Sequence, residues 1–227
     1  MTFWEHLDEL RGVIIRCLAV TILLMIVAFV FKDEVFSVVL HPKGKDLQLI
    51  NTAVTGQFIT HMKVSFYVGL IGAMPYILYQ LFHFISPGLY QQERRLALRL
   101  VISGYFMFAI GVLFSYFVIF PFTIEFLGNY QVSSEVRNLI SLESYMDTLL
   151  MLSLMLGVVF ELPVVSWILS RFGLLTAKTM RSMRRPAIIT IVVIAAIITP
   201  TSDAFTLLLV SVPIYLLYEI SILVVRK

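Results

Sequence analysis

The chain has 227 residues, of which 59% are hydrophobic and only 14% charged, and its mean hydropathy is +0.94. Soluble domains carry about 25% charged residues, so this composition excludes an ordinary soluble domain and indicates an all-α integral membrane protein. The net charge of +3 gives no reason to expect a nucleic-acid partner, and the single cysteine, Cys17, excludes an intramolecular disulfide.

Apolar runs of about one bilayer crossing recur along a single polytopic membrane domain, residues 1–227, since a spanning helix needs about 20 residues. The first run follows an acidic stretch and lacks a small-residue cleavage site, so we expect a retained anchor. The fifth run is short, so we expect local bilayer thinning, a partial crossing or a hairpin with the sixth. The six expected spans are residues 13–31, 64–85, 96–120, 145–169, 187–199 and 204–225.

The positions of the basic residues predict the orientation. Most of the 17 Lys and Arg residues fall on one side of the membrane when both termini are placed in the cytoplasm. We therefore expect an N-in, C-in topology, with extramembrane loops over 32–63 and 122–144 on the far side and a basic cytoplasmic loop over 170–186. Prolines in or beside several spans predict kinks and a curved bundle.

The segment FWEHLDELR, residues 3–11, precedes the first span. Phe3, Leu7 and Leu10 share one helical face, which is typical of an interfacial helix. One interpretation is packing on the membrane surface. The other is contact with a basic partner, because anionic lipid repels the three acidic side chains of this segment.

The segment FHFISPGLYQQERR, residues 82–95, separates the second and third spans. Phe84 and Tyr90 flank a Pro-Gly turn, and Glu93 is followed by two arginines. One interpretation is an aromatic belt and a solvated cytoplasmic loop, in which Glu93 pairs with a neighbouring arginine. The other is a binding surface.

Acidic residues in or beside the later spans are candidate functional groups, because a carboxyl group in lipid is costly. Glu161 has apolar neighbours and is followed by Pro163, so it is either functional or bonded to backbone groups that the proline frees. Glu219 lies near the cytoplasmic end of the last span, where it can reach the interface. Asp203 precedes that span and is a candidate helix N-cap.

Sequence signatures of enzymes are absent. The chain has no Walker A loop, GxSxG or HExxH motif, and its four histidines are not at metal-ligand spacing. We expect no catalysis, cofactor or metal. From the residues alone, two functions remain open. The chain is either a protein-transport receptor or a small-solute secondary transporter that uses Glu161.

Six segments, in order and over essentially the whole chain, resemble TatC, the polytopic core subunit of the twin-arginine protein translocase. The part at 78–95 is by far the most specific. The segments are EHLDELR (5–11), MPYILYQLFHFISPGLYQQERR (74–95), FSYFVIFP (114–121), FELPVV (160–165), ITPTSDAF (198–205) and VPIYLLYEISI (212–222).

The resemblance implies a six-helix, cupped receptor for twin-arginine signal peptides of folded cargo, with two short final helices. It also implies that the protein lies in the cytoplasmic (inner) membrane, contacts membrane lipid and takes part in export driven by the proton gradient. It further implies homo-oligomers, and hetero-oligomers with single-span TatA/TatB-type subunits. It assigns signal-peptide binding to Glu9, Glu93, Phe84, Arg11 and Tyr90, partner-helix contact to Glu161, Tyr116 and Asp203, and structural roles to Pro42, Pro87 and Pro163.

The resemblance also suggests why a carboxyl group stands beside two arginines at 93–95. A signal with two adjacent arginines presents two planar guanidinium groups, which carboxylates bind in a bidentate manner. We hypothesise that Glu9 and Glu93 converge on that pair, while Phe84 contacts an apolar residue of the signal.

Overall fold

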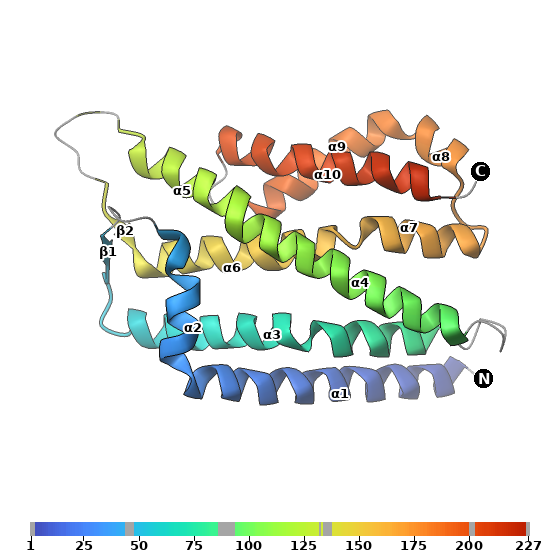
Figure 1. The fold of residues 1–227 in the computed structure, drawn as a ribbon, viewed down its shortest axis with the longest axis horizontal. Coiled ribbons are helices and arrows are strands. Elements are labelled where there is room, and N and C mark those ends of the chain that lie inside the picture. Colours follow the sequence, from blue (N-terminus) through green and yellow to red (C-terminus); the bar gives the residue numbers. More distant parts are fainter. Residues whose placement is uncertain are drawn as a thin grey trace. The chain divides into compact units, whose positions relative to one another are not determined.

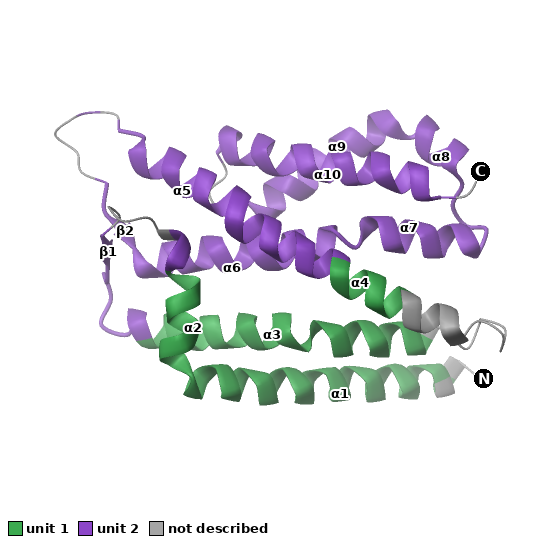
Figure 2. Cartoon of the chain, viewed as in Figure 1, with its two compact units in different colours: residues 1–40, 58–106 green, residues 41–57, 107–227 purple. Residues whose placement is uncertain are grey.

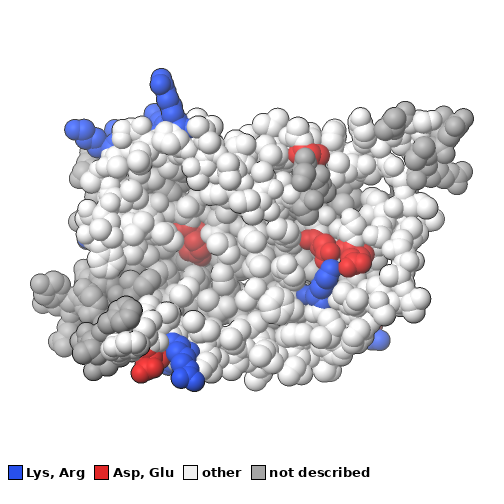
Figure 3. Space-filling view, turned by 180° about the vertical axis from the view of Figure 1, so that it is seen from behind, with Lys and Arg blue, Asp and Glu red and all other residues white. Residues whose placement is uncertain are grey.

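The structure is a computed structural model that describes residues 3–43, 48–85, 94–131, 133, 138–199 and 203–225. It is mostly helical, as expected (Figure 1). Five helical segments among the described residues are long and apolar enough to cross a membrane. They are His6–Val30, Gly56–Phe84, Leu100–Asn129, Leu142–Arg171 and Ala204–Val224. On the face shown in Figure 3, charged side chains occupy only a few places.

The chain divides into two compact units, which Figure 2 colours separately. Unit 1 comprises residues 1–40 and 58–106, and unit 2 comprises residues 41–57 and 107–227. The helices α3 and α4 each contribute residues to both units.

Unit 1 contains α1 (Phe3–Val30), α2 (Lys32–Val39), most of α3 (Gly56–Ile85) and the start of α4 (Arg94–Phe114). α1 and α3 run side by side (Figure 1). On α3, the ring of His61 stacks on Phe29 of α1, with centroids 4.1 Å apart, and meets the edge of the Phe36 ring of α2 at 5.7 Å. These rings hold all three helices together at this point.

Two boundaries differ from the expected spans because helices continue past the apolar runs. α3 begins at Gly56, well before residue 64. α4 continues through a π-helical turn, η4 (Ser115–Ile119), into α5 (Phe120–Asn129), so the helix does not end at Pro121, where the sequence predicted the end of this span. Pro121 has no N–H to donate to the carbonyl of Phe117, and a wide π turn accommodates that missing bond without ending the helix.

α6 (Leu142–Val159) and α7 (Leu162–Arg171) form one expected span with an interruption at Phe160 and Glu161. There the N–H of Glu161 donates to the carbonyl of Val158 at 3.1 Å, a tighter turn than in an α-helix. Pro163 explains the break, because it has no N–H for the carbonyl of Val159. The break places the Glu161 side chain at the junction of the two helices.

The C-terminal part contains α8 (Ala177–Ser182), α9 (Arg184–Ile198) and α10 (Ala204–Val224). α8 lies within the segment expected as a plain basic loop, and the Tyr218 hydroxyl of α10 donates to its Met180 carbonyl at 2.7 Å. α9 has 15 residues, which agrees with the short fifth apolar run. α10 packs against α7 and α9.

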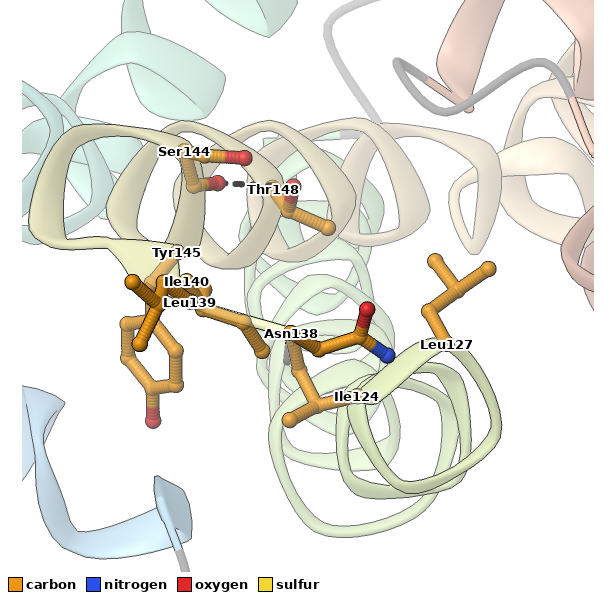
Figure 4. A pocket seen from close by; sticks show the side chains of 8 residues that line it. All are labelled: Ile124, Leu127, Asn138, Leu139, Ile140, Ser144, Tyr145 and Thr148. Atoms are coloured by element: carbon orange, nitrogen blue, oxygen red, sulfur yellow. Dashed lines mark hydrogen bonds between the residues drawn. The ribbon is translucent and has the colours of Figure 1, made fainter. Parts of the chain in front are cut away.

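The expectation of an all-α chain missed a short parallel pairing between two loops of unit 2. β1 (Leu49–Ile50) pairs with β2 (Ile140–Ser141), and Leu49 lies opposite Ile140. The chain between α2 and β1 includes the 3-10 turn η1 (His41–Lys43), which contacts α5. Next to β2, a pocket of about 240 Å³ is bordered by apolar side chains and by Asn138, Ser144, Tyr145 and Thr148 (Figure 4).

Candidate functional site

The first candidate site lies in unit 1, between the beginning of α1 and the end of α3. Glu9 is partly buried on α1, and its Oε2 atom is buried with no hydrogen-bond partner among the described residues. Phe84 lies in the last turn of α3, where its ring stacks on His6 with centroids 4.3 Å apart and planes at 16°. Because His6 and Glu9 are three residues apart on one helix, they share a face. His6 thus joins the turn of α1 that carries Glu9 to the last turn of α3, which carries Phe84.

Of the other residues expected at this site, only Arg11 lies in the described part of the chain. Arg11 is exposed on α1, and it lies two residues from Glu9, so the two side chains do not share a face. Glu93, Tyr90 and Pro87 lie outside the described residues, so their roles stay predictions. Pro42 lies in η1, which belongs to unit 2.

The second candidate site is Glu161 in unit 2. Its side chain is only 8% exposed, and its Oε1 atom has no hydrogen-bond partner within the described part of the chain. A buried polar atom without a partner costs about 1–3 kcal/mol of stability. The interruption before Pro163 therefore leaves an acid with unused hydrogen-bonding capacity, rather than one fully bonded to freed backbone groups.

The two residues expected to act with Glu161 have different surroundings. Tyr116 is half-buried in the π turn η4, which packs against α6. Asp203 is the N-cap of α10 and accepts a hydrogen bond from the Thr206 N–H at 2.7 Å. Its interpretation as a helix cap is therefore confirmed.

Glu219 differs from Glu161 in having partners in the structure. Arg184, at the first position of α9, donates to its Oε2 at 2.7 Å, and the Tyr215 hydroxyl donates to its Oε1 at 3.0 Å. The pair joins α9 to α10. Because Arg184 and Glu219 are 35 residues apart, no sequence spacing indicated this contact.

Two features of these sites were missed from the sequence. His6 stood in a segment already identified as a candidate, but only its proximity to Phe84 shows that it contributes a ring contact. The π turn was hidden in an uninterrupted apolar run, where Pro121 was the only signal. Among the described residues, no group of three or more His, Cys, Asp and Glu side chains could hold a metal ion.

Comparisons with known proteins agree with this architecture. The family model "Sec-independent protein translocase protein (TatC)" matches residues 5–213. The Sec-independent protein translocase protein TatC of Deinococcus radiodurans is 35% identical, covering 98% of this chain and 85% of that protein. The protein TatCy of Bacillus subtilis is 34% identical, covering 99% of this chain and 88% of that protein.

A solved structure gives the same result for the fold. A crystal structure described as Twin Arginine Translocase Receptor- TatC superimposes with a TM-score of 0.86 at 34% identity, covering 96% of this chain and 97% of that one. A second crystal structure, of that receptor in DDM, gives a TM-score of 0.88, again at 34% identity, with 98% and 100% covered. With its sequence matched from residue 5 to residue 213 and its fold shared with solved TatC structures, this chain belongs to the TatC family.

Proposed function

We propose that this chain is the core subunit of a twin-arginine translocase and the receptor for twin-arginine signal peptides of folded proteins. The observation that carries the proposal is the match to the TatC family over residues 5–213. Five long apolar helices among the described residues support a multi-pass membrane protein. The family supports the cytoplasmic membrane, a transport role and no catalysis. Residues 1–227 are proposed to form a single membrane domain.

The signal peptide binds between the beginning of α1, which carries Glu9, and the end of α3, which carries Phe84. Glu9 offers a carboxylate oxygen with no partner among the described residues, and Phe84 offers a ring for an apolar side chain. Glu93 supplies the second carboxylate, so that each arginine of the signal has one bidentate acceptor. Tyr90 is proposed to border the same site, and Arg11, which does not share the face of Glu9, to contact the signal peptide from another side of α1.

A binding measurement tests this function. Purified protein should bind a twin-arginine peptide at least about tenfold more tightly than the same peptide with two lysines, because lysine has no planar fork. Glu9→Gln should weaken binding of the arginine peptide by about tenfold, since charged hydrogen bonds contribute roughly 1.5–3 kcal/mol each, less at a wet surface. Asp8→Asn is the matched control, because Asp8 is an exposed acid on the same helix. Equal affinity for both peptides, or equal losses in both variants, would mean that only net charge is recognised.

The proposed topology has six spans with both termini in the cytoplasm, α9 being the short fifth span. The distribution of basic residues and the 15 residues of α9 support it. The cupped arrangement of the helices stays a prediction.

Cysteine labelling checks this topology. In a Cys17→Ser background, Val54→Cys and Ala204→Cys should react with an impermeant maleimide in intact cells. Lys178→Cys should react only after permeabilisation, since α9 would separate it from Ala204. All three native side chains are exposed, so an unreactive site reflects its side of the membrane. Labelling of positions 178 and 204 under the same condition would contradict a crossing by α9.

Single-span TatA/TatB-type subunits are the proposed membrane partners, in a hetero-oligomer that holds more than one copy of this chain. Glu161, with an unpartnered Oε1 among the described residues, supports a contact with a polar group of a partner helix. Tyr116 and Asp203 belong to the same proposed contact. Hydrogen bonds between helices in membranes average about 0.6 kcal/mol, so apolar packing has to supply most of the affinity.

A further inference from the structure

We propose that His6 is a positioning residue of the signal-peptide site, whose imidazole ring holds the ring of Phe84 beside Glu9. The proposal deepens the function proposed above and rests on it. His6 would not contact the arginines itself. It would fix the aromatic surface that lies next to the carboxylate that binds them.

The geometry of the ring pair supports this role. The His6 and Phe84 centroids are 4.3 Å apart with an interplanar angle of 16°, which is a stacked arrangement. The two residues come from different helices of unit 1, so the contact joins the beginning of α1 to the end of α3. By contrast, the neighbouring His83 stacks on Tyr79, at 6.1 Å, and this contact lies within a single helix.

Helix ends explain why such a contact is needed. Terminal turns fray because their backbone groups lack some helical hydrogen bonds. Phe84 lies in the last turn of α3, and His6 lies in the second turn of α1. A side chain that is mobile before binding loses conformational entropy when a ligand arrives, so a ring that is already held binds more tightly. Stacking therefore organises the site before the signal peptide arrives.

The position of Glu9 gives the stack a second effect. Glu9 follows His6 by three residues, so its carboxylate lies on the same face of α1 as the ring pair. Two flat rings beside a carboxylate exclude water from one side of the ion pair that it forms. Partial exclusion of water strengthens the bond between a carboxylate and a guanidinium group. Histidine suits the position because its ring face packs while its nitrogen edge remains compatible with the exposure of this residue.

The test is the affinity of purified protein for a twin-arginine peptide. His6→Ala should weaken binding by about three- to tenfold, the range expected for one aromatic pair. His6→Phe retains the ring and should remain within about twofold of the native chain. Leu7→Ala is the control for loss of an exposed apolar side chain on the same turn, and it should leave affinity unchanged.

A double-mutant cycle separates positioning from a general effect on folding. If His6 acts through Phe84, adding His6→Ala to Phe84→Ala should weaken binding no further. The proposal is wrong if the losses of affinity in the two single variants multiply in the double variant. It is also wrong if His6→Ala binds with native affinity, or if His6→Phe does not retain that affinity.

The same measurements distinguish an error in the proposed function from an error in this inference. If the native chain does not prefer the arginine peptide to the lysine peptide, the proposed function itself is wrong. If that preference is present and falls in Glu9→Gln but not in His6→Ala, only the role of His6 is wrong.

Discussion

Replacing Gly69 by alanine is expected to destabilise the protein by about 2–3 kcal/mol, the upper part of the range for overpacking. A Cβ atom at Gly69 would lie 2.6 Å from the backbone nitrogen of Met25 and 2.8 Å from its Cα. Both atoms belong to the main chain of α1, so no side-chain rotation relieves the contact. α1 and α3 would have to separate, and helices in lipid associate largely through such close packing of small residues.

Gly72→Ala is the matched control on the same helix. Its Cβ would meet only the Cδ1 atom of Leu24, at 3.5 Å, which is an ordinary contact. Alanine is also the better helix former by roughly 1 kcal/mol, so this variant should be as stable as the native chain or slightly more stable. Thermal unfolding in detergent, followed by circular dichroism and by size-exclusion chromatography, measures the stability of both variants. Equal midpoints for Gly69→Ala and Gly72→Ala would show that α1 and α3 are not packed as described.

The same substitution links packing to the proposed function. Glu9 and Phe84 stand on the two helices that Gly69 allows to approach. A Gly69→Ala protein that still folds should therefore also bind the signal peptide less tightly, because the ring pair and the carboxylate would no longer meet.

Hydropathy predicted the positions of the long helices because their apolar runs are nearly continuous. It predicted a stop at Pro121 because proline normally ends a helix, whereas the π turn at Ser115–Ile119 accommodates the missing bond and the helix continues. It missed β1 and β2 because two-residue strands have no periodicity to detect. The boundaries that failed are those set by local backbone geometry.

Motif resemblance placed Glu9, Phe84 and Glu161 among the candidates, but it did not show what surrounds them. The stack of His6 on Phe84 and the pairing of Arg184 with Glu219 join residues far apart in sequence, so only the folded chain shows them. The cap at Asp203 was predictable, because its partner is three residues away.

Glu161→Leu is expected to raise the stability of the isolated protein by about 1–3 kcal/mol, the cost of an unsatisfied buried polar group. Glu161 is 8% exposed and its Oε1 has no partner among the described residues, whereas leucine fills a similar volume without that cost. A residue that lowers the stability of the isolated subunit is consistent with a group reserved for a partner helix. The same variant should therefore form fewer cross-links to TatA/TatB-type subunits from Met155 or Leu162, on either side of the break, with affinity reduced by about threefold.

Glu219→Leu provides the opposite case, because both oxygens of Glu219 are bonded, to Arg184 and to Tyr215. Its loss would leave those donors without their acceptor and should lower the unfolding midpoint. Glu161→Gln keeps a hydrogen-bonding group and should retain the cross-links, which separates partner recognition from charge. If Glu161→Leu instead destabilises the isolated protein as Glu219→Leu does, then Glu161 is satisfied within its own chain. Its place at the α6–α7 break would then be structural, and the partner helix would have to dock elsewhere.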